Sequence, residues 1–524
     1  MSALLLSLTG GDGDVSSKQR EQDQIDEEII ARYLPVCALR TKRNALSPIS
    51  RLPDELLATI FIFNARQHVI SEWAKVDTFR TPPPQVPLWV RVSYVCRRWR
   101  MVALGCPTLW TYVFFVSRVW MAVLLQRSQM APLRARIDLA VPPYGIPYES
   151  HRSLKALEML FEHLPRMEEL LIRGVSADVV PNIISKLIVP APLLQSLQIT
   201  TSSDKRSLAF LDGSPPTLPV VFSHTTPKLR SLDLSRLDIA WNSLTLIGMT
   251  SLRLSNVPRL HTMQQQSPIP SQNPRLTDLE LENIFPRPAS PIQDPLTEKM
   301  TLPCLSRLSI MATIPGTVHF LSYVHVPLTT EIRLKCDFEG HDNLSQLLSY
   351  VQERFSPREA EREGSRPEQP VRSLNIDGAP PWMFFVTCST SRGYNYRALS
   401  CKKVFPPFLP YNYDWGRGIP LKIDLTDNHS TALTETVMVN IFQHLPLACL
   451  QSISVYISSE AEISRIFWRN LFDLARELRF IKLRYITLRG FVTTLAPGHR
   501  GWREQSQTLT AFITVERLGY VEGS

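Results

Sequence analysis

The feature that most constrains the fold is an internal repeat in the second part of the chain. Its pattern is a proline, any residue, an apolar residue, any two residues, a leucine, any residue, and a leucine or isoleucine. Complete copies begin at Pro165, Pro192, Pro227, Pro274 and Pro303. Weaker copies end at Leu254, Leu334, Ile376, Leu425, Val455 and Leu483. Copies at intervals of roughly 20 to 50 residues are typical of stacked repeats, so we expect one repeating architecture here.

The alternating leucines of each copy predict a short strand whose apolar side chains point to one side. Apolar residues with a helical period precede several copies and predict helices at residues 154–164, 344–351, 433–445 and 463–474. The pattern resembles the core of a leucine-rich repeat. It predicts an α/β solenoid over residues 151–490, followed by a C-terminal tail at 491–524. A single unit cannot bury its own apolar face, so neighbouring copies are expected to stabilise one another by stacking.

Insertions interrupt this repeat. The stretches 264–274 and 285–295 are rich in proline and serine, and 356–370 is charged. Residues 379–420 are the most aromatic part of the chain. They fit a loop that covers the solenoid core, or a partner-binding surface, because aromatic anchors dominate the energetics of many interfaces.

A different pattern occupies residues 49–110, ahead of the repeat. Pro53 suits the first position of a helix, and Asp54 and Glu55 place negative charge in its first turn. One apolar stripe at helical spacing follows, made of Leu52, Leu56, Leu57, Ile60 and Phe61. A second stripe consists of Val92, Val95, Cys96, Trp99, Val102 and Ala103 and predicts a second helix, which Gly105 and Pro107 end. Periodicity alone predicts a helical hairpin whose stripes pack on each other.

The order of residue types in this stretch resembles the F-box. A Leu-Pro-Asp-Glu-Leu-Leu run at 52–57 is followed by Cys-Arg-Arg-Trp at 96–99 and by Leu-Trp at 109–110, while 64–87 lengthens the middle. The stretch is most similar to the large F-box family of mushroom-forming (basidiomycete) fungi. The resemblance implies an F-box domain at 48–111 that binds a Skp-type adaptor and, through it, a cullin–RING ubiquitin ligase. The expected F-box core or adaptor contacts are Leu52, Pro53, Leu56, Leu57, Ile60, Phe61, Val95, Cys96, Trp99, Leu109 and Trp110.

The remaining segments are shorter. Residues 1–16 are predicted to be a disordered lead, and 17–47 an amphipathic helix and linker with Ile25, Ile29, Ile30 and Tyr33 on one face. We expect this helix to pack on the F-box domain, although pairing with another helix is an alternative. The connecting segment 112–150 should hold a β-branched stretch, a helix and a strand at 133–139.

The net charge of +9 has a distinct location. Every charged residue from Arg80 to Arg136 is an arginine. These side chains fit a solvated face whose stems cover apolar surface. A complementary acidic protein surface is a second explanation, and nucleic acid a third, because no nucleic-acid reader motif accompanies the charge.

Motifs for chemistry are missing from the sequence. The eight cysteines form no CxxC pair, the histidines are scattered, and neither a nucleophile elbow nor a phosphate-binding glycine loop occurs. We therefore predict no catalytic residues, no metal and no cofactor, and expect that the protein is not an enzyme. The N-terminus lacks a signal peptide, and no apolar segment is long enough to span a bilayer, so a cytoplasmic or nuclear protein without membrane contact is expected.

Together these features predict a small helical F-box domain followed by a leucine-rich-repeat-like α/β solenoid, an α + α/β fold. The resemblance implies a substrate-recognition subunit of a Skp–cullin–F-box (SCF) E3 ubiquitin ligase, whose repeat region binds an unknown target protein. A ligase-independent interaction scaffold and a basic-patch nucleic-acid binder are the alternatives, and nucleic acid is the less expected partner.

Overall fold

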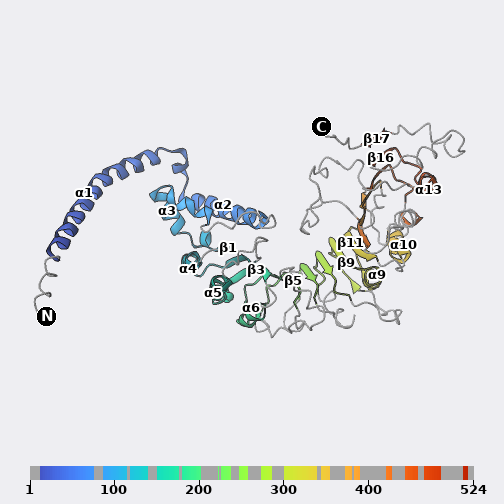
Figure 1. Cartoon of the computed structure of the whole chain (residues 1–524), viewed down its shortest axis with the longest axis horizontal. Coiled ribbons are helices and arrows are strands. Elements are labelled where there is room, and N and C mark those ends of the chain that lie inside the picture. The colour runs from blue at the N-terminus through green and yellow to red at the C-terminus, as the bar shows by residue number, and fades with distance from the viewer. Residues whose placement is uncertain are drawn as a thin grey trace, which may run out of the picture. The chain divides into compact units, whose positions relative to one another are not determined.

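A computed structural model of the chain describes residues 12–75, 87–114, 118–139, 150–175, 180–201, 222, 226–237, 247–257, 273–285, 300–327, 329–338, 344–354, 372–379, 383–389, 421–427, 443–445, 447–457, 465–484 and 512–516. It divides into two compact units (Figure 1). Unit 1 comprises Met1–Ile137 and Val141–Arg166, and unit 2 comprises Asp138–Ala140 and Met167–Ser524. None of the described helices is both long and apolar enough to cross a membrane.

Unit 1 is mainly helical. Its elements are α1 (Asp12–Ala45), the 3-10 helix η1 (Pro48–Arg51), α2 (Asp54–Lys75), η3 (Leu88–Tyr94), α3 (Arg97–Leu104), η4 (Pro107–Trp110), β1 (Tyr112–Phe114), α4 (Arg118–Arg127), β2 (Leu133–Asp138), α5 (Ser150–Phe161) and η5 (Leu164–Arg166). Strands β1 and β2 pair in parallel, with Tyr112 opposite Arg134. The helix and the strand predicted after the F-box-like stretch are therefore confirmed, and the β-branched residues before them form β1.

Helix α1 differs from its prediction. It is one continuous helix from Asp12 to Ala45, although the sequence predicted a shorter helix, from about residue 17 to 33, followed by a linker. Every described side chain from Lys18 to Arg43 is exposed. The expectation that its apolar face packs on the F-box-like residues is therefore wrong. Near the last turn of α1, Ser50 Oγ donates to the backbone carbonyl of Asn44 at 2.6 Å.

A buried arginine stabilises the end of unit 1. Arg166 Nη1 donates to Ser128 Oγ at 3.0 Å and to the carbonyl of Ala131 at 2.8 Å, and its Nη2 donates to the carbonyl of Leu125 at 3.3 Å. Burial lowers the pKa of Arg166. Leu125 lies in the last turn of α4, where the helix dipole favours a positive charge, which explains why a cation is tolerated there.

Unit 2 is a sheet with helices beside it. Its strands are β3 (Met167–Val175), β4 (Ser196–Thr201), β5 (Ser231–Ser235), β6 (Ser251–Ser255), β7 (Asp278–Glu282), β9 (Arg307–Thr313), β11 (Glu331–Phe338), β14 (Leu421–Asp427), β13 (Met383–Ser389), β12 (Ser373–Ala379), β15 (Ser452–Ile457), β16 (Phe480–Arg484) and β17 (Phe512–Glu516), given in spatial order. The short strands β8 (Met300–Thr301) and β10 (Val324–His325) pair separately. The helices are α6 (Val180–Lys186), α9 (Ile314–Tyr323), α10 (Leu344–Arg354) and α13 (Arg465–Leu474). Helices α9 and α10 contact each other, and α9 lies beside β9 and β11 (Figure 1).

The repeated leucines occupy equivalent positions in successive parallel strands. Leu197 of β4 is opposite Leu232 of β5, which is opposite Leu252 of β6, and the same row continues through Leu279, Leu308 and Ile332. All of these side chains are buried. The predicted strands and their buried leucines are thus confirmed, and their apolar sides form the core of unit 2.

Hydroxyl side chains join successive copies at the strand starts. Thr250 Oγ1 donates to the carbonyl of Arg230 at 3.1 Å, Thr277 Oγ1 to that of Thr250 at 2.9 Å, and Ser306 Oγ to that of Thr277 at 2.9 Å. Each of these carbonyls also accepts backbone N–H groups of the next copy. The ladder satisfies backbone groups where the chain turns into the strand.

The chain leaves three strands through a left-handed residue. Arg236, Asn256 and Asn283 follow β5, β6 and β7 with φ of 56°, 51° and 51°. Asn283 Nδ2 donates to Asn256 Oδ1 at 3.1 Å, so these asparagines of neighbouring copies are bonded. Asparagine tolerates this conformation because its short polar side chain bonds locally, whereas arginine has no such advantage.

Other predictions in unit 2 have mixed outcomes. The helices predicted at 344–351 and 463–474 are confirmed by α10 and α13, and that at 154–164 by α5 of unit 1. Strand β13, inside the segment predicted as a loop, is instead antiparallel to both β12 and β14 and enters the sheet between them. The other aromatic residues of 390–420 and most of the helix predicted at 433–445 lie outside the described residues.

Candidate functional site

Helix α2 has two apolar sides with different environments. Leu57 and Phe61 are fully buried, whereas Leu56, Ile60 and Phe63 are 51%, 45% and 63% exposed. The three exposed residues are spaced at i, i+4 and i+7, so they form one continuous line along the helix. We call them the outer stripe. The helix begins at Asp54, and the carbonyl of Pro53 accepts the N–H of Leu57, so Pro53 precedes the first helical residue.

The residues that lengthen the middle of this stretch begin as a continuation of α2. The helix extends to Lys75, and Ala65 and Val69 on the inner side are buried. Residues 76–86 lie outside the described part of the chain.

The second predicted helix is broken at Cys96. Residues 88–94 form η3 and residues 97–104 form α3, while Cys96 between them is extended at φ −159° and ψ 170°. The sulfur of Cys96 accepts the N–H of Trp99 at 3.5 Å and so caps α3. The prediction of one continuous helix from Val92 to Ala103 is therefore wrong, because a capping residue interrupts its apolar period.

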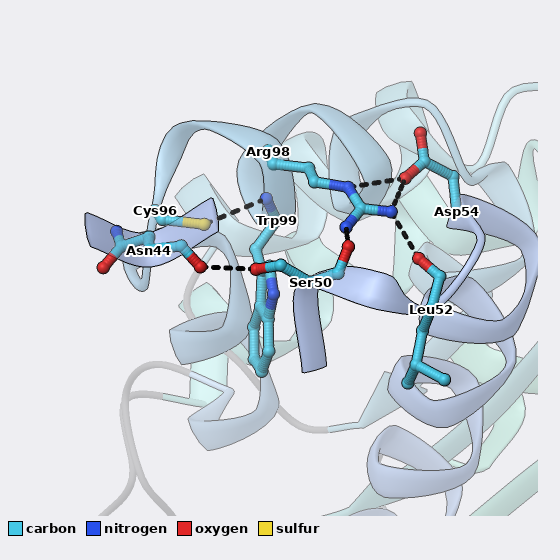
Figure 2. A network of polar contacts seen from close by, with 7 residues as sticks. All are labelled: Asn44, Ser50, Leu52, Asp54, Cys96, Arg98 and Trp99. Carbon is cyan, nitrogen blue, oxygen red and sulfur yellow. Dashed lines mark hydrogen bonds and ion pairs between the residues drawn. The ribbon is translucent and has the colours of Figure 1, made fainter. Parts of the chain in front are cut away.

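Arg98 connects the two halves of the F-box-like stretch (Figure 2). Its Nε donates to Asp54 Oδ1 at 2.9 Å, its Nη1 donates to the carbonyl of Ser50 at 2.6 Å, and its Nη2 donates to the carbonyl of Leu52. Nη2 also lies 2.7 Å from Asp54 Oδ1. One guanidinium therefore holds the turn that carries Leu52 and Pro53 against the start of α3.

Aromatic rings fill the core beneath these helices. Trp110 is fully buried and meets Trp89 edge-on at 5.2 Å between ring centroids. Its Nε1 donates to the carbonyl of Ala103 at 2.7 Å. The half-buried Trp99 packs on Phe61 at 4.9 Å. The closing Leu-Trp pair and the end of α3 thus share one core with α2.

The structure sorts the predicted site residues by burial. Leu57, Phe61, Leu109 and Trp110 are buried, and Leu52, Cys96 and Trp99 are partly buried. Pro53, Leu56, Ile60 and Val95 are exposed. Three exposed apolar side chains of the same unit were not predicted from the sequence: Phe63, Tyr94 and Met101. Phe63 could have been found, since it continues the spacing of Leu56 and Ile60.

Several arginines of the basic stretch have contacts within unit 1. Besides Arg98, Arg127 stacks over the Trp110 ring at 4.3 Å, and Arg134 lies over the Tyr112 ring at 5.6 Å. Burial, and to a lesser extent the neighbouring Arg100, lower the pKa of Arg127. Arg91, Arg97, Arg100 and Arg118 are exposed. Part of the positive charge therefore has a structural role, which weakens the argument for a continuous nucleic-acid surface.

Unit 2 carries a polar cluster on the sheet side opposite the leucines. Gln198, Asp233, Arg253 and Glu280 occupy the same cross-strand row of β4 to β7. Gln198 Nε2 donates to Asp233 Oδ2 at 2.7 Å, and Arg253 pairs with Glu280 and lies 3.8 Å from Asp233. Burial raises the pKa of Asp233 to about 6, against the opposing effect of Arg253. Among the described residues, no three His, Cys, Asp or Glu side chains are placed to hold a metal ion.

Comparisons with known proteins agree with the geometry of unit 1. Residues 49–116 match the F-box-like family model. No curated protein matches the chain. Among solved structures, the crystal structure of the Rad7 and Elc1 complex in yeast matches at 13% identity over 93% of this chain and 97% of that chain. Its TM-score is 0.31, too low for any conclusion about this protein.

The family match begins at Ile49, at the turn held by Arg98, and extends past the buried Trp110 into β1. The match therefore covers α2, η3, α3 and η4, the elements that share one core. The chain carries an F-box-like domain at residues 49–116, followed by a mainly parallel sheet with helices.

Proposed function

We propose that this chain is the substrate-recognition subunit of an SCF E3 ubiquitin ligase. In this proposal the F-box-like domain binds a Skp-type adaptor, which connects it to a cullin–RING ligase, and unit 2 binds a target protein. The observation that carries the proposal is the F-box-like match over residues whose packing leaves the outer stripe uncovered. We expect the complex to act in the cytoplasm or nucleus.

The outer stripe supports the adaptor half of the proposal. One face of α2 carries three apolar side chains that are about half exposed: Leu56, Ile60 and Phe63. They lie outside the core that the F-box-like domain forms with its buried residues. Complete burial of a large apolar side chain contributes roughly 1.5–3 kcal/mol, so covering the remaining half contributes roughly 1 kcal/mol per residue. Three such contacts would form the centre of a specific interface, with charged residues at its edge.

Unit 2 supports the target half. We propose that its repeating strands form a leucine-rich-repeat-like solenoid, because the buried leucines share one register and Asn256 and Asn283 bond across neighbouring copies. In such a stack one side of the strands is core, which leaves the polar side of the sheet for recognition. The row from Gln198 to Glu280 lies on that side.

In this proposal the chain carries out no chemistry itself. It would raise the effective concentration of a target near a ubiquitin-loaded enzyme, which accelerates transfer by proximity.

Stepwise reconstitution tests the proposal. The full chain is co-expressed with the Skp-type adaptor of its own organism, and the purified pair is then mixed with the cullin–RING subunits. The proposal predicts a stable pair and then a ternary assembly. A pair that forms but excludes the cullin would favour the ligase-independent scaffold. Failure of the folded chain to bind the adaptor would overturn the proposal.

A further inference from the structure

Helix α1 of unit 1 has an apolar face that no other described part of the unit covers. Ile25, Ile29, Tyr33, Val36 and Leu39 fall within an arc of about 120° when residues are placed at 100° intervals. All five side chains are exposed. Arg32, which pairs with Glu28 of the same helix, and Arg40 also fall within the arc, whereas Pro35 lies outside it. An apolar stripe this long on a helix that does not pack on its own domain is a candidate surface for another chain.

The charges along α1 are divided between its two halves. From Glu21 to Glu28 every charged residue is acidic, and from Arg32 to Arg43 every charged residue is basic. The stripe spans the boundary between these halves. A second copy of α1 placed parallel would align acid with acid and base with base, whereas an antiparallel copy would align each acidic half with a basic half.

We propose that α1 pairs with α1 of a second copy of this chain in an antiparallel arrangement. Ile25 then lies near Leu39 of the second copy, and Ile29 near Val36 of the second copy. Asp26 and Arg40 follow Ile25 and Leu39 by one residue each, so they lie on the same side of the Ile25–Leu39 contact and face each other between the copies. Glu21 and Lys42 form the corresponding pair on the other side.

Two-fold symmetry follows from this arrangement, because each helix offers the same surface that it binds. The pairing needs no ligase and holds whether or not the proposed function is correct. Were that function correct, one assembly would carry two F-box-like domains and two target-binding units. Two linked binding units raise apparent affinity for a target with repeated sites through effective concentration.

Sedimentation equilibrium of the full chain tests the proposal over a series of rising concentrations. The expected result is a concentration-dependent increase from the monomer mass of 59.7 kDa towards twice that mass. The variant Ile29→Asp/Val36→Asp should remain monomeric at every concentration. Far-ultraviolet circular dichroism checks that each variant stays folded.

A charge-exchange series identifies the orientation. Asp26→Arg and Arg40→Asp should each weaken self-association at least about tenfold, and the double variant should restore it. Positions 26 and 40 lie about 21 Å apart along one helix, so the restoration cannot arise within a single copy. Glu27→Arg, which makes the same charge change on the opposite side of α1, is the matched control and should associate normally.

Two results would overturn the proposal. The first is a protein that stays at 59.7 kDa at all concentrations. The second is a dimer whose strength is unaffected by Ile29→Asp/Val36→Asp, since another surface would then be responsible.

Discussion

Replacing Arg98 tests how the F-box-like domain is held together. Its guanidinium donates to the carbonyls of Ser50 and Leu52 and to the carboxylate of Asp54, residues more than forty positions earlier in the chain. The perturbation is Arg98→Ala. Arg98→Lys keeps the charge but loses the forked N–H donors of the guanidinium. Asp54→Asn removes only the ion pair.

The magnitude depends on which of these contacts dominates. The ion pair is solvated, since the side chains of Arg98 and Asp54 are 36% and 61% exposed, so it should contribute about 0–1 kcal/mol. Each bond from a charged donor to a carbonyl contributes roughly 1.5–3 kcal/mol when buried, and about 1 kcal/mol at this exposure. Arg98→Ala should therefore destabilise the turn by about 2–3 kcal/mol. Arg98→Lys should recover about 1 kcal/mol at most, because one ammonium cannot reach all three acceptors.

Hydrogen exchange is the appropriate assay, because a chain of two units need not unfold in a single transition. Peptides covering residues 49–61 report on the turn and the start of α2. A loss of 2–3 kcal/mol corresponds to roughly 30- to 150-fold faster exchange of amides that open with this turn. Asp54→Asn should accelerate exchange no more than about fivefold.

Two outcomes would refute the expectation that the carbonyl bonds of Arg98 contribute more than its ion pair. An Asp54→Asn effect as large as that of Arg98→Ala would show that the ion pair dominates. Disappearance of the Arg98→Ala effect in high salt would show the same, since salt screens exposed charges more than carbonyl bonds.

Three further predictions concern other positions. Trp110→Phe removes the N–H that donates to the carbonyl of Ala103, and it should destabilise unit 1 by about 2–4 kcal/mol. The loss should appear as faster hydrogen exchange of the α3 amides. An exchange rate within twofold of the unaltered chain would argue against a stabilising role for that bond. Arg236→Asn relieves a left-handed arginine and should stabilise unit 2 by about 0.5–1 kcal/mol in urea unfolding, whereas destabilisation would mean that the Arg236 side chain matters more than its backbone strain. Burial raises the folded-state pKa of Asp233 from 3.8 to about 6, so the folded state binds the extra proton and stability should fall as pH rises from about 4 to about 6. Asp233→Asn should remove up to about 3 kcal/mol of that decline, and parallel pH profiles for the two proteins would contradict it.

The sequence predicted helix α2 but could not tell which of its apolar side chains would be buried and which exposed. Leu56 and Leu57 are adjacent leucines in the same apolar cluster, yet one is half exposed and the other fully buried. Periodicity places both near one face, because they differ by only about 100° around the helix. Which side becomes core depends on where Trp99 and Trp110 pack, and that is a property of the folded domain.

Contacts between distant residues were beyond the sequence as well. The arginines between Arg80 and Arg136 were expected to form a solvated face, but Arg98 turns back to the carbonyls of Ser50 and Leu52. Backbone carbonyls leave no trace in a residue pattern, so such a contact cannot be predicted from spacing. The break at Cys96 was missed for a similar reason, because cysteine is an uncommon cap.

In unit 2 the sequence predicted strands better than it predicted their order. Each Leu-x-Leu copy marks a strand because alternating burial leaves a period of two. Strand β13 lies in an aromatic segment that lacks the Leu-x-Leu pattern. Its antiparallel position between β12 and β14 depends on long-range pairing. The exposure of α1 was also unpredictable, since an amphipathic pattern does not identify what covers it.

The most direct test of the central claim is the affinity of the full chain for its Skp-type adaptor, measured by titration calorimetry. The Ile60→Glu variant is compared with the unaltered chain and with Val119→Glu, which places the same charge at an exposed apolar site on α4. The account predicts that Ile60→Glu, at the middle of the outer stripe, weakens binding at least about tenfold, while Val119→Glu binds normally. Equal affinities for all three proteins would contradict the claim that the outer stripe binds the adaptor.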